Sequence, residues 1–286
     1  MDARPHSLEN ALFTIKTNSA DKVTIADALT VAGALRLANR ARGSKVLRTL
    51  CLNSCSLNDD IVVIVSDILK HSSVRTLYVG HNRIGATGVR ALVEASLYAG
   101  SLQILSLYGN DLGNEGARTV AVLLPSIRLI SLDLSRNSIG DEGALALAAG
   151  LRASHLRDLL LSDNNISDVA GVALARSVHE NARIECLDLQ GNAAITDVTA
   201  GEMLLSLQTH GSLRNVTLSP GTAVSEHSCQ DIHRRLQILH SMRAKLMTVM
   251  CSAMYIPRLG KNSPCQWLSP DLIRAICDVL TFDDNL

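Results

Sequence analysis

Histidine and cysteine side chains, which can hold a transition metal, come closest together at His227, Cys229, His233 and His240. His233 and His240 are seven residues apart, so both could lie on one face of a helix. None of these spacings matches a paired metal-binding motif, and scattered surface histidines explain them better. We therefore predict no metal site and no cofactor.

Catalytic motifs are also missing from the sequence. It contains no G-x-S-x-G, no H-E-x-x-H and no G-x-x-x-x-G-K-[ST], and the GKN at Gly260 lacks the preceding glycine of a phosphate loop. Seven cysteines form an odd set without paired spacing, which argues against a disulfide framework and favours a reducing compartment. We predict that the protein is not an enzyme and that it lies in the cytoplasm, with the nucleus or the cilium as alternatives.

The charges cancel, since 27 basic and 27 acidic residues give a net charge of zero. No long-range field therefore attracts the chain to nucleic acid or to an anionic membrane, and we expect neither as a partner. The first residues lack an apolar signal region, and no apolar run approaches the length of about 18 residues that indicates membrane insertion.

An apolar pattern restarts seven times along the chain at intervals of 27 to 29 residues, which indicates stacked repeats. Most restarts read close to L-x-x-L-x-L-x-x-N-x-L/I, as in LQILSLYGNDL and LISLDLSRNSI. They begin at Leu47, Val74, Leu102, Leu129, Leu156, Ile184 and Leu213.

This pattern resembles the leucine-rich repeat family, in its long, ribonuclease-inhibitor-like subclass, over roughly residues 10 to 240. The resemblance implies a horseshoe-shaped solenoid that binds proteins. Relatives in this subclass include innate sensors, GTPase-activating proteins of the Ran cycle and structural subunits of ciliary axonemes.

Each repeat begins with an alternating L-x-L segment, which predicts a short strand, and continues with apolar residues at helical spacing. Strands lie about 4.8 Å apart, whereas packed helices need about 8 to 10 Å, so the array must bend. We predict an α/β fold, a right-handed β-α solenoid with a parallel sheet on the concave face and helices on the convex face. The recurring asparagines are predicted to be structural, because they can bond turn backbone of neighbouring repeats; they are Asn82, Asn110, Asn137, Asn164 and Asn192, with Cys55 in the same position of the first clear repeat.

Three regions are predicted. Residues 1–45 form an irregular capping repeat, in which FTIKTN is a strand and turn with Asn18 in the asparagine position, followed by a helix in IADALTVAGALRLANRARG. Residues 46–240 form the solenoid of about seven repeats, and residues 241–286 form a helical cap or tail. A long helix is predicted from about Ser225 to Met250, followed by a linker and a shorter amphipathic helix that begins after Ser269.

Strand positions that point away from the core predict the binding surface. One column contains Thr49, Thr76, Ile104, Ser131, Asp158, Cys186 and Asn215, and a second contains Cys51, Tyr78, Ser106, Asp133, Leu160, Asp188 and Thr217. Aromatic groups precede an acidic strip, which suggests a basic protein segment as the ligand; the alternative is that these carboxylates are solvated, with Arg136 and Arg157 as counter-ions. The predicted site residues are Tyr78, His81, Tyr108, Asp133, Arg136, Asp158, Asp163 and Asp188.

The tail is a second candidate site. Its WLSPDLIRAICDVL segment is similar to the opening helix of an F-box and to SOCS-box-like tails, so Trp267, Leu272 and Ile276 are candidates for docking a ubiquitin-ligase adaptor. The alternative that we favour is a cap anchored by Trp267 over the last repeat.

Taken together, these features predict a protein-interaction scaffold, with a structural role in a large cytoskeletal or ciliary assembly as a narrower hypothesis. Two alternatives stay open, a ubiquitin-ligase substrate receptor and a Ran-type GTPase-activating protein that uses Arg83.

Overall fold

A computed structural model describes residues 7–17, 19–209, 212–219 and 224–254. Within them, eight short strands form one parallel sheet in which each strand pairs with the next along the chain. The strands are β1 Lys22–Thr24, β2 Thr49–Cys51, β3 Thr76–Tyr78, β4 Ile104–Ser106, β5 Ser131–Asp133, β6 Asp158–Leu160, β7 Cys186–Asp188 and β8 Asn215–Thr217.

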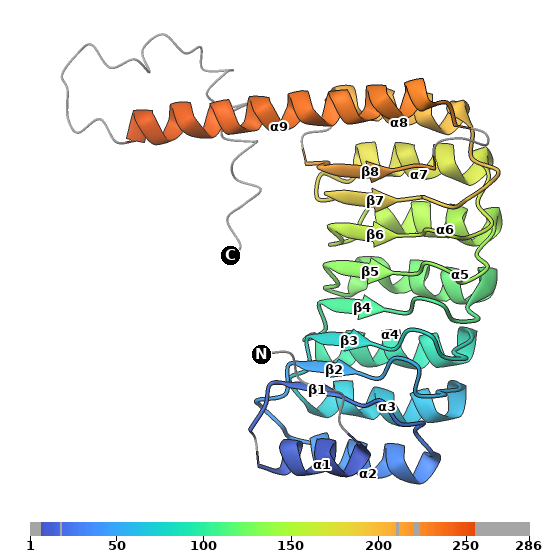
Figure 1. Cartoon of the computed structure of the whole chain (residues 1–286), viewed down its shortest axis with the longest axis vertical. Coiled ribbons are helices and arrows are strands. Elements are labelled where there is room, and N and C mark those ends of the chain that lie inside the picture. The colour runs from blue at the N-terminus through green and yellow to red at the C-terminus, as the bar shows by residue number, and fades with distance from the viewer. Residues whose placement is uncertain (1–6, 18, 210–211, 220–223, 255–286) are drawn as a thin grey trace.

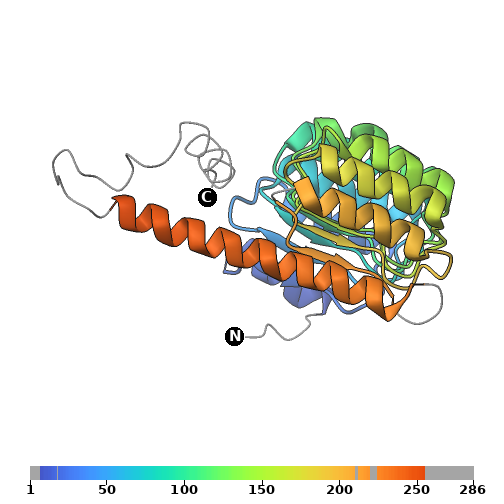
Figure 2. The same ribbon diagram turned by 90° about the horizontal axis from the view of Figure 1, so that it is seen from above.

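Helices alternate with the strands, and most of them cover one face of the sheet, as Figures 1 and 2 show. They are α1 Leu8–Lys16, α2 Val31–Ala41, α3 Asp59–His71, α4 Ala86–Ala99, α5 Gly113–Leu123, α6 Asp141–Leu151, α7 Asp168–Glu180, α8 Asp197–Thr209 and α9 Glu226–Met254. The other face of the sheet carries no helix layer, and we call it the concave face. The predicted α/β solenoid is confirmed.

The core lies between the sheet and the helices and is almost entirely aliphatic. The central residue of β2 to β7 is a leucine that is completely buried, while its two strand neighbours are partly exposed on the concave face. Small helix residues such as Gly143 and Ala144 are buried on the inner side of the convex helices, as their spacing predicts.

The first repeat differs from the prediction for FTIKTN. The first four of these residues belong to helix α1, whose Ala11, Leu12 and Ile15 are buried on one face. The strand lies further along the chain at β1, where Val23 is buried and pairs in register with Leu50 of β2. A short apolar run fits both the helical period and the strand period. Here the buried residues stand at positions i, i+1 and i+4, which is the spacing of one helix face. The sheet therefore begins upstream of residue 46, and Asn18 lies outside the described residues.

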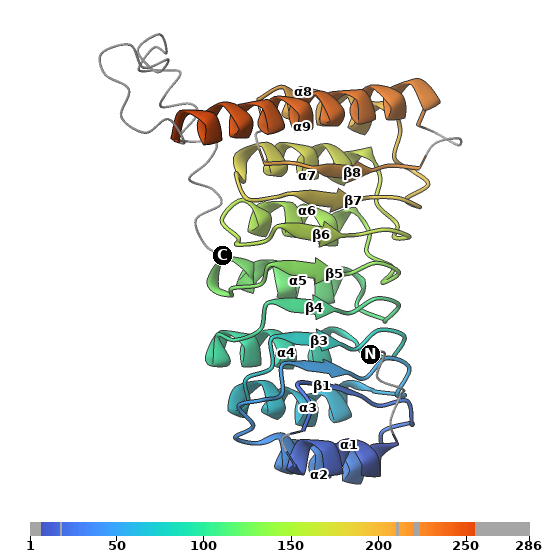
Figure 3. The same ribbon diagram turned by 60° about the vertical axis from the view of Figure 1, so that its left-hand side comes forward.

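The other end is covered by α9, which includes the helix predicted from about Ser225 to Met250. Its first half packs on the last repeat, where Ile232 and Leu236 are buried, and the helix then extends beyond the array (Figures 1 and 3). The linker and the second helix predicted after it lie outside the described residues. Within the part of the chain that is described, no helix has the length and apolar character needed to cross a membrane.

Adjacent helices are joined at their first turns by a row of hydrogen bonds that we call the helix-start ladder. At most junctions a carboxylate or amide in the first helical turn accepts the backbone N–H of the residue that precedes the next helix. The acceptors are Asp59, Asn114, Asp141, Asp168 and Asp197.

The ladder is interrupted between α4 and α5, where Ala86 has no side-chain acceptor to offer. Gly113, at the start of α5, has a left-handed φ of 57° and donates its N–H to the Asn137 carbonyl instead. Next to it, the buried Oδ1 of Asn137 has no hydrogen-bond partner among the described residues. The junction between α4 and α5 therefore lacks the helix-start bond, and the junction that follows it, between α5 and α6, lacks a bond to Asn137 Oδ1.

Candidate protein-binding surface

The five recurring asparagines are buried and bind backbone of two successive repeats, which confirms their predicted structural role. Asn164 Nδ2 donates to the carbonyls of Leu134 at 3.1 Å and Leu161 at 3.0 Å, and its Oδ1 accepts the N–H groups of Asn137 and Ile139, both at 3.0 Å. These bonds fix the turn that follows each strand and so fix the rim of the concave face.

Cys55 occupies the same position in the β2 repeat. Its Sγ donates to the Ile25 carbonyl of the preceding repeat at 3.2 Å. Burial raises the pKa of this thiol to about 11, so it stays protonated near neutral pH and is a poor nucleophile.

The residue before each of these positions adopts the left-handed conformation, with φ between 53° and 76°. Glycine adopts this conformation freely, whereas other residues are strained in it. Glycine is present in only two of the six repeats, at Gly109 and Gly191, and the others carry Ser54, His81, Arg136 and Asp163. The turn thus points the side chains of His81, Arg136 and Asp163 outward, and the cost is backbone strain.

Three of these side chains, His81, Arg136 and Asp163, form a cluster with Tyr108 that we call the exit rim. The His81 and Tyr108 rings lie edge to face with centroids 4.8 Å apart, and the Arg136 guanidinium lies 5.4 Å from the Tyr108 centroid. Arg136 Nε bonds Asp163 Oδ2 at 2.9 Å, and this bond raises the pKa of Arg136. Asp163 therefore has a counter-ion, as the alternative interpretation of the acidic strip proposed.

Strand pairing places the two predicted columns in register on the concave face, because Thr49, Thr76 and Ile104 are direct partners, and so are Cys51, Tyr78 and Ser106. The same pairing continues through β8 and extends back to Lys22 and Thr24 of β1. The sequence analysis missed these β1 positions because Val23 and Ile25 replace the leucines of the repeat.

Three half-buried aspartates lie on the sheet itself: Asp133, Asp158 and Asp188. Asp133 accepts the Ser106 hydroxyl and the Ser135 N–H, both at 3.0 Å, and Asp188 accepts the Gln190 N–H at 3.0 Å. Burial raises the pKa of Asp158, against the effects of a Ser131 hydrogen bond and the Arg157 charge. Arg157 forms its ion pair with Glu185, at 3.5 Å.

None of the three aspartates forms an ion pair within 4.0 Å among the described residues. Asp133 and Asp188 are oriented by neutral donors, and Asp158 interacts with the Ser131 hydroxyl and with the charge of Arg157. The eight predicted site residues thus separate into the exit rim and a sheet surface of Tyr78 and the three aspartates. Trp267, Leu272 and Ile276 lie outside the described residues.

Two histidines of α9 each contact a different neighbouring side chain. His227 Nε2 lies 3.2 Å from Asp231 Oδ2, and His233 Nε2 lies 2.8 Å from Gln237 Nε2. Among the described residues, no group of three or more histidine, cysteine, aspartate or glutamate side chains is placed to hold a metal ion.

Stacked β-α units that share one parallel sheet define this molecule as a solenoid repeat protein. The family model of the leucine-rich repeat matches four stretches of this array, residues 70–93, 101–121, 129–148 and 152–175, which supports the leucine-rich repeat family. A comparison with curated proteins finds no match.

Solved structures with a similar fold include a tropomodulin C-terminal domain from Caenorhabditis elegans, with 11% identity, a TM-score of 0.33 and coverage of 85% of this chain and 99% of that chain. Actin-binding site 2 of leiomodin-1 has 12% identity and a TM-score of 0.33, with 87% and 99% covered. A chain of the yeast Rad7–Elc1 complex has 17% identity and a TM-score of 0.49, with 77% and 55% covered.

Proposed function

We propose that the protein is a non-enzymatic scaffold that binds a basic segment of a protein partner along its concave face and exit rim. The observation that carries this proposal is that Asp133, Asp158 and Asp188 face the concave surface without an ion-pair partner in the described residues. Neutral donors hold their carboxylates in place, so the surface is preorganised for a cation.

The spacing of the aspartates suits an extended ligand. Each lies one strand and two positions from the next, which places neighbouring Cα atoms about 8 Å apart. Side chains on one face of an extended peptide repeat every ~6.7 Å, so alternate Lys or Arg residues could reach successive carboxylates. Tyr78 and the exit rim add the aromatic and arginine groups that interfaces favour.

The repeat geometry also supports the long, ribonuclease-inhibitor-like subclass, because a helix of 11 to 14 residues follows each strand from β2 to β7. We propose membership of that subclass and a structural role in a large cytoskeletal or ciliary assembly as the setting. The ligase-receptor alternative depends on the tail, which lies outside the described residues, and the exposed Arg83 has no feature that favours GTPase activation.

The test is to remove the three charges without changing side-chain size. The variant Asp133→Asn/Asp158→Asn/Asp188→Asn keeps an oxygen that can accept each hydrogen bond. We expect at least about tenfold weaker retention of partners from native cells, measured by quantitative mass spectrometry. The difference should shrink as salt rises, because exposed charges are screened.

A matched control, Glu94→Gln on the outer side of α4, should leave retention unchanged. A chain that ends at Pro257 should retain the same partners if the concave face carries the function. Equal retention by the triple variant and the unmodified chain, or loss of cullin-adaptor subunits by the shorter chain alone, would contradict the proposal.

A further inference from the structure

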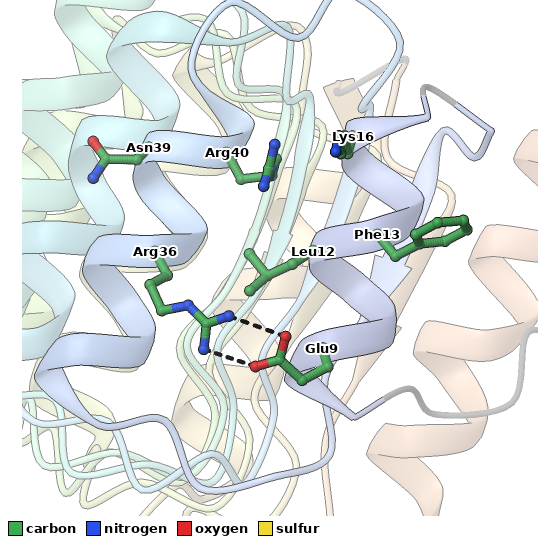
Figure 4. A pocket seen from close by; sticks show the side chains of 7 residues that line it. All are labelled: Glu9, Leu12, Phe13, Lys16, Arg36, Asn39 and Arg40. Carbon is green, nitrogen blue, oxygen red and sulfur yellow. Dashed lines mark hydrogen bonds and ion pairs between the residues drawn. The ribbon is translucent and has the colours of Figure 1, made fainter.

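A groove of about 500 Å³ lies at the N-terminal end of the array, between α1 and α2 (Figure 4). Leu12 lies between the two helices; Phe13 also lines the groove and is 67% exposed, and its ring points away from α2. The other lining residues are polar or charged: Glu9, Lys16, Arg36, Asn39 and Arg40. The groove thus combines apolar surface with a mainly cationic rim.

Two cations of this rim have no ion-pair partner among the described residues. Arg36 forms a bidentate pair with Glu9 at 2.7 and 3.0 Å, which neutralises both. Lys16 and Arg40 form no ion pair with any described residue. Along the rest of the convex side, arginines such as Arg118, Arg152 and Arg176 pair with a glutamate of the next repeat. The groove therefore favours an occupant that carries carboxylates as well as apolar side chains.

The chain itself contains such a segment in residues 265–286, which we call the tail. Its sequence has four aspartates and one arginine, and five apolar residues at helical spacing from Leu272 to Leu280. The C-terminal end of the core is not open to it, because α9 covers that end with Ile232 and Leu236. The surface on which the cap interpretation placed the tail is thus occupied.

We propose that the groove between α1 and α2 binds the tail of a second copy of this chain. The groove and α9 lie at opposite ends of the array (Figure 1). Seven strand steps and two end helices separate them by about 54 Å, and the residues 255–264 that connect α9 to the tail span at most about 36 Å. This connection is too short for the tail to dock on the groove of its own chain, whereas docking between chains places no demand on its length. The contact joins two different surfaces, so it assembles copies head to tail.

A complementation experiment with the full chain tests this contact. One variant changes the groove, Lys16→Glu/Arg40→Glu, and the other changes the tail, Leu272→Ser/Ile276→Ser. We expect the unmodified chain to self-associate in sedimentation velocity, and each variant alone to associate at least about tenfold more weakly. An equimolar mixture of the two should form heterodimers, because one variant keeps its tail and the other keeps its groove.

Trp267 gives a second readout, since it is the sole tryptophan of the chain and lies in the tail. Its emission should shift to shorter wavelength as the unmodified chain associates, relative to a synthetic peptide of residues 265–286. The control Arg90→Glu/Arg128→Glu changes two exposed cations elsewhere and should associate normally. A monomer at every concentration, a blue-shifted Trp267 that does not depend on concentration, or a mixture that does not associate would each overturn the proposal. The proposal does not depend on the concave face, and its variants leave Asp133, Asp158 and Asp188 intact.

Discussion

The asparagines of the repeat show how much structure a single side chain can fix. Asn164 contacts backbone of residues 25 to 30 positions upstream and of its own turn, and it is nearly fully buried. No aliphatic side chain of this size can replace these bonds, because both a donor and an acceptor are required.

Replacing Asn164 by Ala should therefore lower the free energy of unfolding by about 3 kcal/mol or more, because it leaves several buried N–H and carbonyl groups without partners. Urea denaturation measures this loss. The neighbouring Asn165 is exposed, and Asn165→Ala should cost less than about 0.5 kcal/mol. A similar loss for both variants would show that the hydrogen bonds of Asn164 do not account for this stability.

At the scale of single residues, the sequence predicted the positions that the repeat period determines. The asparagine positions and the two concave columns follow from the L-x-L alternation, since every second residue faces away from the core. The Arg136–Asp163 ion pair and the stacking on Tyr108 depend on left-handed turns that aim these side chains along the rim, and the alternation carries no signal for that conformation.

At the scale of the helices and strands, the helix-start ladder explains why neighbouring helices keep their register. Asp168 is its most fully bonded member. Partial burial raises the pKa of Asp168, but hydrogen bonds from Thr196 and Thr199 outweigh this effect and hold the pKa below its ordinary value. The carboxylate thus joins the start of α7 to the start of α8.

The stability that Asp168 contributes should depend on pH. Because its pKa is lower in the folded state, the contribution is fully present above the ordinary value of 3.8 and is lost as the pH falls through the folded pKa. We expect Asp168→Asn to lower the free energy of unfolding by about 1 kcal/mol at pH ~7, and the difference from the unmodified chain to shrink below pH ~4. Asp60→Asn, at an exposed position in α3, is the control and should show no such trend.

The helices and strands were predictable from the sequence except at the ends. The seven restarts correspond to β2 through β8, and FTIKTN was placed in a strand because it is too short to distinguish two periods. The position of α9 across the last repeat was not encoded in any pattern of the repeat itself.

At the scale of the whole molecule, stability in a repeat array is the sum of contributions from repeats and from the junctions between them. The junction between α4 and α5 lacks a helix-start acceptor at Ala86, and at the next junction, between α5 and α6, Asn137 Oδ1 has no donor among the described residues. The β4–α5 repeat therefore lacks one bond on each of its two sides.

Hydrogen exchange should reveal the weaker bonding of this repeat. Amides of residues 107–114 should exchange faster than the equivalent amides of residues 134–141 and 161–168, because local opening follows the weakest interface. Peptide-resolved mass spectrometry under native conditions makes the comparison within one sample. Equal protection of the three segments would show that the missing bonds are compensated elsewhere.

The asparagine hydrogen bonds and the helix-start ladder both repeat from one unit to the next. This repetition has an evolutionary consequence. Because β5 and β6 present equivalent donors and acceptors one period apart, a tandem duplication of residues 131–157 would bring its own partners for both neighbours. The length of the protein can therefore grow by whole units without redesign of the rest, whereas an insertion of a few residues within a unit would break the alignment on both sides.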